Sequence, residues 1–328
     1  MIISRTPLRM SFAGGGTDLP AFAEQHGGAV VSTAIDKWIR VVVSHRFEGD
    51  VRVGYSETEI VSDANHVRHE LVREAMRRAG IPRGVDVLTL ADVPSRGTGL
   101  GSSSAVTVGL LNALYAFQGI AKPAMTLADE ACQIEIEVLG KPIGRQDQYA
   151  SAVGGCNLIE FLPGRGGVKV SPLLTPPGTI ERLHAHLLLF YTGQPRGSDE
   201  ILRAQGDAVS AGDAAERMIQ MRDLAYELRD RLQTGDVESV GEILRRGWEL
   251  KRSAAGVAGN DAIESAIAAA YDAGAVGGKL LGAGGGGFLL LFAPPDAQLR
   301  VRDALDQLRE IPFRFAFQGT SILLLEQA

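Results

Sequence analysis

A glycine- and serine-rich segment, residues 94–105 (Pro-Ser-Arg-Gly-Thr-Gly-Leu-Gly-Ser-Ser-Ser-Ala), constrains the fold of this chain more than any other. Apolar residues recur at helical spacing directly after it, so the segment is predicted to be a turn that enters a helix. Its glycines permit positive φ, and the N–H groups and dipole of the helix start attract an anion, usually a polyphosphate. The residues predicted to form this phosphate turn are Pro94, Gly97, Gly99, Leu100, Gly101, Ser102, Ser103 and Ser104.

The phosphate turn differs from the two commonest nucleotide-binding loops. It lacks the Gly-Lys-Ser/Thr of a Walker A loop, and no acidic residue is spaced for a Rossmann ribose contact, which disfavours an NAD-dependent enzyme. A serine hydroxyl on such a turn can reach a phosphate-bound magnesium ion. The alternative is a flexible surface linker, but Pro94, Leu100 and the apolar helix pattern argue against it.

The composition is typical of a globular protein of two domains, or one large one, with 328 residues of which 45% are apolar and 22% charged. The net charge of −6 argues against sequence-independent binding to nucleic acid. The chain shows no signal-peptide pattern and no apolar span of about 18 residues, so we expect a cytoplasmic protein with no membrane partner. Cys132 and Cys156 form neither a disulfide framework nor a metal motif, and Cys132 is expected to be a buried thiol.

The predicted elements mix strands and helices without a regular alternation, which favours a two-domain α+β fold. Strands are predicted over residues 30–35, 39–44, 85–90, 186–191 and 288–292. Helices are predicted over residues 68–78, 126–139, 198–210, 214–232, 236–253, 262–273 and 297–308, with Thr126 as the N-cap of the second. A segment rich in proline and glycine at 171–178 suggests a junction between a domain of residues 1–175 and one of residues 176–328.

A second glycine-rich segment, residues 6–18, places Gly14, Gly15 and Gly16 after an apolar strand and just before Asp18. Arg9 lies in that strand, and a buried arginine needs an anionic or hydrogen-bonding partner. That partner could be Asp18, in which case the pair only ties the strand to its turn. A functional role for Arg9 is the other interpretation.

Three acidic residues between these segments and the C-terminal half are candidates for chemistry. Glu135 and Glu137 lie at opposite borders of the apolar face of a predicted helix, so helical spacing cannot choose between them. Asp147 follows Gly144 in a loop rich in arginine and glutamine, where a carboxylate can take a proton or orient a hydroxyl. The alternative for Asp147 is a helix N-cap.

A third glycine-rich segment, residues 279–288, contains four consecutive glycines before a strand, which indicates close approach of the backbone to a ligand or to another loop. The sequences, order and spacing of the three glycine-rich segments resemble those of the GHMP kinases, and the resemblance spans nearly the whole chain. It implies an N-terminal domain similar to domain 2 of ribosomal protein S5 and a ferredoxin-like C-terminal domain. ATP and substrate would lie between them.

The resemblance also implies roles for particular residues. The phosphate turn would bind ATP, and Ser103 and Glu135 would hold Mg²⁺, because family members place the magnesium carboxylate five residues before the glycine that matches Gly140. Asp147 matches the catalytic base that lies near the accepting hydroxyl. Arg9 would stabilise that aspartate or the developing charge.

Within this family the motifs look most like those of D-glycero-D-manno-heptose 7-phosphate kinases, which phosphorylate the anomeric C1 hydroxyl on the route to the GDP-heptose of surface polysaccharides. The distal phosphate of such an acceptor would be bound by Arg196 or Lys251, with Arg145 and Lys141 in reserve. The residues expected at the substrate are Gly15, Gly16, Thr17, Asp18, Gln146, Arg196, Gly284 and Gly285.

Two other functions are considered beside a heptose 7-phosphate kinase. One is an anomeric kinase for a free fucose-, galactose- or mannose-like sugar, although galactokinases have Gly-Glu-His-Thr-Asp where this chain has Gly-Gly-Thr-Asp, which disfavours galactose. The other is a non-catalytic sensor of sugar and ATP, against which the joint presence of Ser103, Glu135 and Asp147 argues. The sequence leaves a homodimer open.

Overall fold

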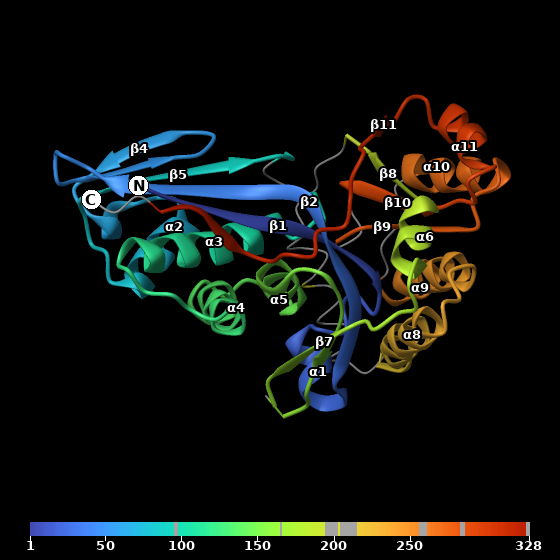
Figure 1. The fold of residues 1–328 in the computed structure, drawn as a ribbon. Coiled ribbons are helices and arrows are strands. Elements are labelled where there is room, and N and C mark those ends of the chain that lie inside the picture. Colours follow the sequence, from blue (N-terminus) through green and yellow to red (C-terminus); the bar gives the residue numbers. More distant parts are fainter. Residues whose placement is uncertain are drawn as a thin grey trace.

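The computed structural model describes residues 1–94, 98–164, 166–193, 203, 215–255, 261–282 and 286–325. They form two β-sheets, each with its own set of helices (Figure 1). The predicted helix over residues 198–210 lies outside the described residues, apart from residue 203. The same is true of four predicted site residues: Gly97, Arg196, Gly284 and Gly285.

The first sheet has eight strands, and helices cover one of its faces (Figure 1). Six strands follow the order β12 (Ser321–Leu325), β1 (Ile2–Ala13), β2 (Gly28–His45), β5 (Val85–Ala91), β3 (Val51–Gly54) and β4 (Thr58–Val61). Beyond this row, β6 (Cys156–Phe161) pairs with β2, and β7 (Val168–Pro172) pairs with β6. The covering helices are α2 (Glu70–Ala79), α3 (Ser102–Phe117), α4 (Ala124–Cys132) and α5 (Gln146–Val153).

The two strands predicted over residues 30–35 and 39–44 are wrong as separate elements, because β2 runs through both. The polar residues between them continue the strand, since β1 pairs with β2 on both sides of a register shift between Pro7 and Leu8. The two halves of β2 then have different partners on the other side. Residues 28–33 pair with β6, whereas residues 39–45 pair with β5.

The helix predicted to begin at Thr126 begins two residues earlier, at Ala124, with Pro123 in the N-cap position. Thr126 is therefore not a cap. After Cys132 the helix widens into a π-helical segment, η2 (Gln133–Val138). Such widenings rotate the following side chains relative to a regular helix and are frequent at functional sites.

The second sheet is antiparallel and has four strands, in the order β11 (Arg309–Glu310), β8 (Leu187–Tyr191), β10 (Phe288–Phe292) and β9 (Gly277–Leu280). β10 is buried along its whole length, and its alternate residues enter two different hydrophobic cores. One core is shared with the first sheet, so the two halves of the molecule are packed together. The helices of this half are α6 (Thr179–Ala185), α8 (Ala215–Gln233), α9 (Ser239–Ala255), α10 (Asp261–Asp272) and α11 (Gln298–Ala304).

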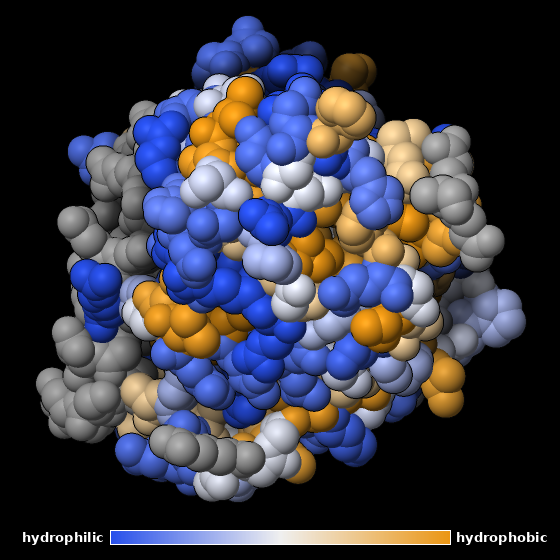
Figure 2. Space-filling view, turned by 90° about the vertical axis from the view of Figure 1, so that its left-hand side faces the viewer, coloured by the Kyte–Doolittle hydropathy of each residue, from blue (hydrophilic) through white to orange (hydrophobic). Residues whose placement is uncertain are grey.

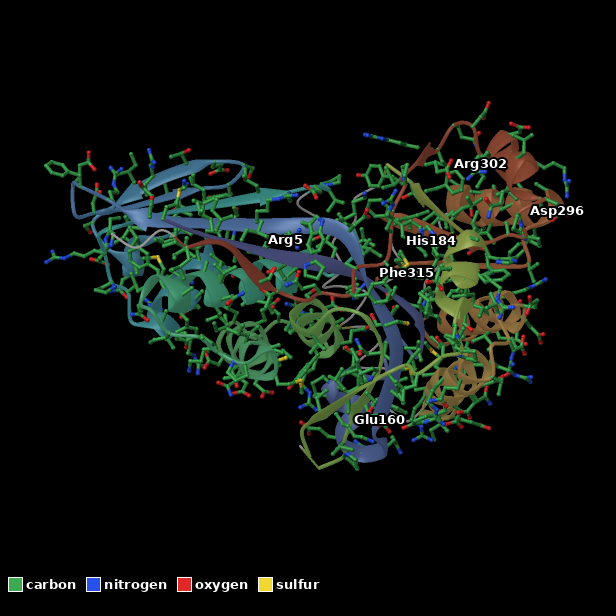
Figure 3. All side chains as sticks on the ribbon, in the orientation of Figure 1. Arg5, Glu160, His184, Asp296, Arg302 and Phe315 are labelled. Atoms are coloured by element: carbon green, nitrogen blue, oxygen red, sulfur yellow. The ribbon has the colours of Figure 1, made fainter. Side chains whose placement is uncertain are left out.

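The chain returns from the second sheet to the first near its end. Phe315 forms an isolated bridge with Ile35 of β2, and its ring lies 5.3 Å from that of His184 at the junction of the two sheets (Figure 3). β12 then pairs with β1, so both ends of the chain lie at the same end of the first sheet (Figure 1). The division at residues 175 and 176 stays a prediction, and β12 belongs to the sheet of the N-terminal part.

The surface at the end of the first sheet shows small groups of hydrophobic residues scattered among hydrophilic ones (Figure 2). Within the described ranges, every helix is too short or too polar to pass through a lipid bilayer. Cys132 is buried, as predicted, and its burial raises the pKa of the thiol well above its usual range.

Candidate active site

The phosphate turn leads directly into α3, as predicted. Gly101 is the N-cap of this helix with a φ of 73°, a left-handed conformation that favours glycine, and no side chain caps the helix. Thr98 braces the turn, because its hydroxyl accepts from the N–H of Leu100 at 3.3 Å and lies 2.8 Å from the hydroxyl of Ser102. The first N–H groups of a long helix are therefore left for a ligand.

The third glycine-rich segment contacts the phosphate turn. A Cβ atom on Gly99 would lie 2.3 Å from the carbonyl oxygen of Leu281, and one on Gly282 would lie 2.4 Å from the Cα atom of Gly99. Both glycines also have positive φ, +71° and +74°. Of the two readings left open by the sequence, the described part of this segment supports close approach to another loop.

Arg9 joins the phosphate turn to Asp147. Its Nε donates to Oδ1 of Asp147 at 2.7 Å, its Nη2 lies 2.5 Å from the same oxygen, and its Nη1 donates to the carbonyl of Gly99 at 2.7 Å. Among the described residues, the ion pair of Arg9 is with Asp147 and not with Asp18. Asp147 lies in the first turn of α5, whose N-cap is Arg145, so the N-cap interpretation of Asp147 is wrong.

Asp147 is the partly accessible member of this pair. Its side chain is 24% exposed, whereas that of Arg9 is 4% exposed. A Cβ atom on Gly101 would lie 3.2 Å from Oδ2 of Asp147, so this second oxygen faces the start of α3. Arg9 therefore holds one carboxylate oxygen and leaves the other beside the phosphate turn.

Asp18 is buried next to Asp147. Its Oδ2 accepts from the backbone N–H of Gln146 at 3.0 Å, and its Oδ1 accepts from the side-chain amide of Gln146 at 2.9 Å. A Cβ atom on Gly144 would lie 1.9 Å from Oδ2, so only glycine fits there. Burial, and then the charge of Asp147, raise the pKa of Asp18 above its usual value. The two carboxylates are thus electrostatically coupled.

The turn before Asp18 is held by Thr17. The Thr17 hydroxyl donates to the carbonyl of Gly14 at 2.8 Å and accepts from the N–H of Ala29 at 3.1 Å, and the side chain is fully buried. Thr17 therefore supports the turn, contrary to its predicted place at the substrate. Gly16 donates its N–H to Oδ1 of Asp18 at 3.2 Å, which places the predicted glycines Gly15 and Gly16 beside that carboxylate.

The π-helical segment turns Glu135 inward and leaves Glu137 exposed, which settles the choice that helical spacing left open. Glu135 accepts from the hydroxyl of Ser104 at 3.2 Å and from the amide of Gln148 at 3.3 Å. Ser104 is thus the serine that contacts Glu135, whereas the side chain of Ser103 is exposed at the start of α3. Burial raises the pKa of Glu135 to about 7.

The oxygen donors around Glu135 suit a magnesium ion. Mg²⁺ prefers carboxylate, hydroxyl and amide oxygens and usually takes only one or two protein carboxylates besides phosphates and water. Oε1 of Gln148 is buried without a hydrogen-bond partner, as a group that awaits a ligand would be. The described residues contain no cluster of three acidic, histidine or cysteine side chains that could hold a metal ion.

We expect Glu135→Gln to change how stability depends on pH. The pKa of Glu135 is about 7 in the folded protein and 4.5 ordinarily, so between these pH values Glu135 is protonated when folded and ionised when unfolded. The free energy of unfolding of wild type therefore falls as the pH rises through this range. The variant lacks this loss, so its free energy of unfolding relative to wild type should rise by up to about 3 kcal/mol from pH 4 to pH 8. Urea denaturation without magnesium measures this; parallel pH curves would contradict it.

Two buried lysines, Lys251 and Lys279, complete the site, and Lys279 is not among the residues predicted from the sequence. Lys251 of α9 donates to the carbonyl of Gly282, and Lys279 of β9 donates to the carbonyl of Phe12 at 3.3 Å. Lys251 was considered for a distal phosphate, but Lys279 was not. Its signal was present, since a lysine inside a strand of glycine and leucine is an unusual buried charge.

Lys141 and Arg145, the other two candidates for binding a distal phosphate, each have a partner of their own. Lys141 forms an ion pair with Glu70, with Nζ 2.7 Å from Oε1. The guanidinium of Arg145 lies 6.0 Å from the centre of the Phe161 ring. Lys141 also donates its backbone N–H to the carbonyl of Glu135 at 3.0 Å, so it lies on the magnesium side of the site and not beside Asp18.

Comparison with known proteins identifies a match in each half of the chain. Residues 65–155 match the GHMP kinases N-terminal domain, and residues 225–309 match the GHMP kinases C-terminal domain. The chain is 28% identical to D-glycero-alpha-D-manno-heptose 7-phosphate kinase of Campylobacter jejuni, over 93% of each chain. It is 26% identical, over 88% of its length, to the bifunctional fucokinase/GDP-fucose pyrophosphorylase of Arabidopsis thaliana, of which it covers 29%.

A solved structure has the same fold along the entire chain. The D-glycero-D-manno-heptose 1-phosphate kinase of Bacteroides thetaiotaomicron superposes with a TM-score of 0.82 at 25% identity and with 100% of both chains covered. The domain matches together span more than half of the chain, and they contain the phosphate turn and the third glycine-rich segment. The chain therefore belongs to the GHMP kinases, with the α+β architecture of their N- and C-terminal domains.

Proposed function

We propose that this protein is an ATP-dependent sugar 1-kinase that transfers the γ-phosphate to the anomeric C1 hydroxyl of D-glycero-D-manno-heptose 7-phosphate. The product would be the 1,7-bisphosphate used for GDP-heptose and surface polysaccharides. The observation that carries the proposal is the position of Asp147, whose free oxygen faces the phosphate turn while Arg9 holds the other oxygen. The heptose acceptor is supported by the similarity to heptose phosphate kinases.

In the proposed reaction Asp147 orients the acceptor hydroxyl and takes its proton on Oδ2. The hydroxyl oxygen attacks the γ-phosphorus as the bond to the ADP oxygen breaks, and catalysis is mostly positioning and charge neutralisation. Arg9 holds Asp147 in place through its ion pair. The N–H groups at the start of α3 hold the phosphates of ATP. A magnesium ion, when bound beside Glu135 with a serine hydroxyl of the turn, supplies further positive charge to the triphosphate.

The sugar would be held on the side of Asp18. Asp18 is fixed by Gln146 and by Gly16, so its carboxylate is already oriented toward acceptor hydroxyl groups. Oε1 of Gln146 is buried without a hydrogen-bond partner, which leaves it free to accept from a sugar hydroxyl. Asp18, Gln146, Gly15 and Gly16 are therefore our proposed sugar contacts among the described residues.

The acceptor is tested by comparing D-glycero-D-manno-heptose 7-phosphate with free heptose, fucose and mannose in an assay of ADP release. We expect the phosphorylated heptose to have the highest kcat/KM, by at least about tenfold, because charge-assisted hydrogen bonds to a phosphate are strong. Phosphorus NMR of the product should show a new anomeric phosphate. A free sugar used equally well would favour the alternative of a free-sugar kinase, which the fucokinase relative supports.

A non-catalytic sensor of sugar and ATP would bind both ligands without releasing ADP. Asp147 and Arg9, placed at the phosphate turn, favour the enzyme over the sensor. We also propose that the protein works in the cytoplasm, where ATP is available, and binds neither nucleic acid nor membrane. The homodimer stays a prediction, which sedimentation would test.

A further inference from the structure

Lys251 and Lys279 are buried charges that the proposed mechanism does not use. They are only 8% and 7% exposed. In the part of the chain that the structure describes, the hydrogen bonds of these two ammonium groups go to backbone carbonyls, of Gly282 and Phe12 respectively. An ammonium group has three donors, so each lysine retains donors for a further partner.

The surrounding carboxylates do not neutralise the two lysines. Asp147 is paired with Arg9, and Asp18 is occupied by three N–H donors from Gly16 and Gln146. The pKa of Lys251 is lowered to about 8, chiefly by burial and also by the charge of Arg9, while Asp18 and Asp147 act in the opposite direction. Burial lowers the pKa of Lys279 to about 7, and the charged groups that act on it, Lys251 and Arg9, lower it too.

This local excess of positive charge calls for an anion. Taking a charge out of water is costly unless it is paired, and a site with more cationic groups (Arg9, Lys251 and Lys279) than carboxylates (Asp18 and Asp147) is stabilised when an anion enters. The phosphates of ATP have their own binding element at the start of α3. A second anion is therefore the natural partner of the lysine pair.

The position of the lysines indicates which anion this is. Lys279 reaches the carbonyl of Phe12, just before the turn that carries Asp18, and Asp18 is the carboxylate that acts most strongly on Lys251. Both lysines thus lie beside the elements of the proposed sugar site. Lys279 is held at the carbonyl of Phe12 in β1, whereas Lys251 is held at the carbonyl of Gly282 in the third glycine-rich segment.

We propose that Lys251 and Lys279 form a phosphate subsite that binds a phosphate already present on the acceptor sugar. The inference rests on the proposed sugar kinase function and deepens it, because it assigns selection for a phosphorylated acceptor to two named residues. In this arrangement Arg9 and Asp147 act at the accepting hydroxyl, and the lysine pair anchors the other end of the acceptor.

The test compares Lys251→Met and Lys279→Met with wild type on D-glycero-D-manno-heptose 7-phosphate and on the unphosphorylated heptose. Methionine keeps the length of the side chain and removes the charge. We expect the loss in kcat/KM of each variant to be about 10- to 100-fold larger for the phosphorylated sugar than for the free sugar, mainly through KM. The control is Lys169→Met, whose exposed ammonium pairs with Glu160 on β6.

Equal losses on both sugars would overturn the subsite and place the lysines at the transferred phosphoryl group instead. Unchanged kinetics in both variants would also overturn it. Lys279→Met carries the same test if Lys251→Met does not fold, as judged by circular dichroism.

Inorganic phosphate is the probe that distinguishes a wrong acceptor sugar from a wrong lysine subsite. In wild type we expect phosphate to inhibit competitively against the sugar, and to lose this inhibition in both lysine variants. If wild type preferred another sugar phosphate but showed this pattern, the heptose 7-phosphate assignment would fail and the subsite would stand. If wild type used only free sugars, both would fail. Phosphate inhibition that competes only with ATP, or that persists in the variants, would remove the subsite.

Discussion

Asp147→Asn should lower kcat by about 10²- to 10⁴-fold, the range typical of removing a general base. Asparagine has nearly the same shape but cannot take the proton of the acceptor hydroxyl on the oxygen that faces the phosphate turn. ATP binding should persist, because the N–H groups of α3 do not depend on the carboxylate. Single-turnover kinetics measure the loss, and titration calorimetry with ATP and magnesium measures the retained binding.

The variant also leaves the buried guanidinium of Arg9 without its anion, so some loss of stability is expected. Thermal unfolding separates that loss from the kinetic effect. The matched control is Asp296→Asn, an exposed aspartate on the outer side of the second domain (Figure 3), which should behave as wild type. Normal turnover by Asp147→Asn would remove Asp147 from the mechanism.

Gly99→Ala should damage both folding and ATP use. Its φ of +71° costs an alanine about 1 kcal/mol, and its Cβ atom would lie 2.3 Å from the carbonyl oxygen of Leu281. The clash adds about 1 to 3 kcal/mol, because the phosphate turn and the third glycine-rich segment must separate. KM for ATP should rise as the turn moves. Urea denaturation and steady-state kinetics measure the two effects.

Gly49 offers a control with the same backbone and open space. Its φ is +75°, and a Cβ atom there would have no neighbour within 4 Å. Gly49→Ala should therefore show only the backbone cost and normal kinetics. If the two variants lost equal stability and bound ATP equally well, the contact between the glycine-rich segments would have no part in holding the site.

Local patterns predicted the elements that depend on local interactions. The helix after the phosphate turn, α2 and the buried strands β8 and β10 lie close to where their spacing placed them. The continuity of β2 was missed because it depends on pairing with β1, which the polar residues between its halves do not reveal. The π-helical segment was missed for a related reason. Regular helical spacing was assumed, and Glu135 could be chosen only by resemblance.

The site was predicted in its parts and not in its pairings. Arg9, Asp18 and Asp147 were all named, but the partner of Arg9 comes from residues 138 positions away, and spacing along the chain cannot show such a contact. The contact of Ser104, rather than Ser103, with Glu135 depends on the direction of the side chains. The same is true of the support that Thr17 gives to its turn. Lys279 begins the third glycine-rich segment, and only its burial near Lys251 and Arg9 draws attention to it.

The pairing of β12 with β1 has a consequence for biosynthesis. During translation β1 emerges first, yet its neighbour β12 lies far along the chain, so the outer edge of β1 stays unpaired until β12 has been synthesised. An open strand edge invites association with other chains. The first sheet is therefore completed only after the second sheet has been synthesised, and a chain cut after residue 175 would lack one strand of the first sheet.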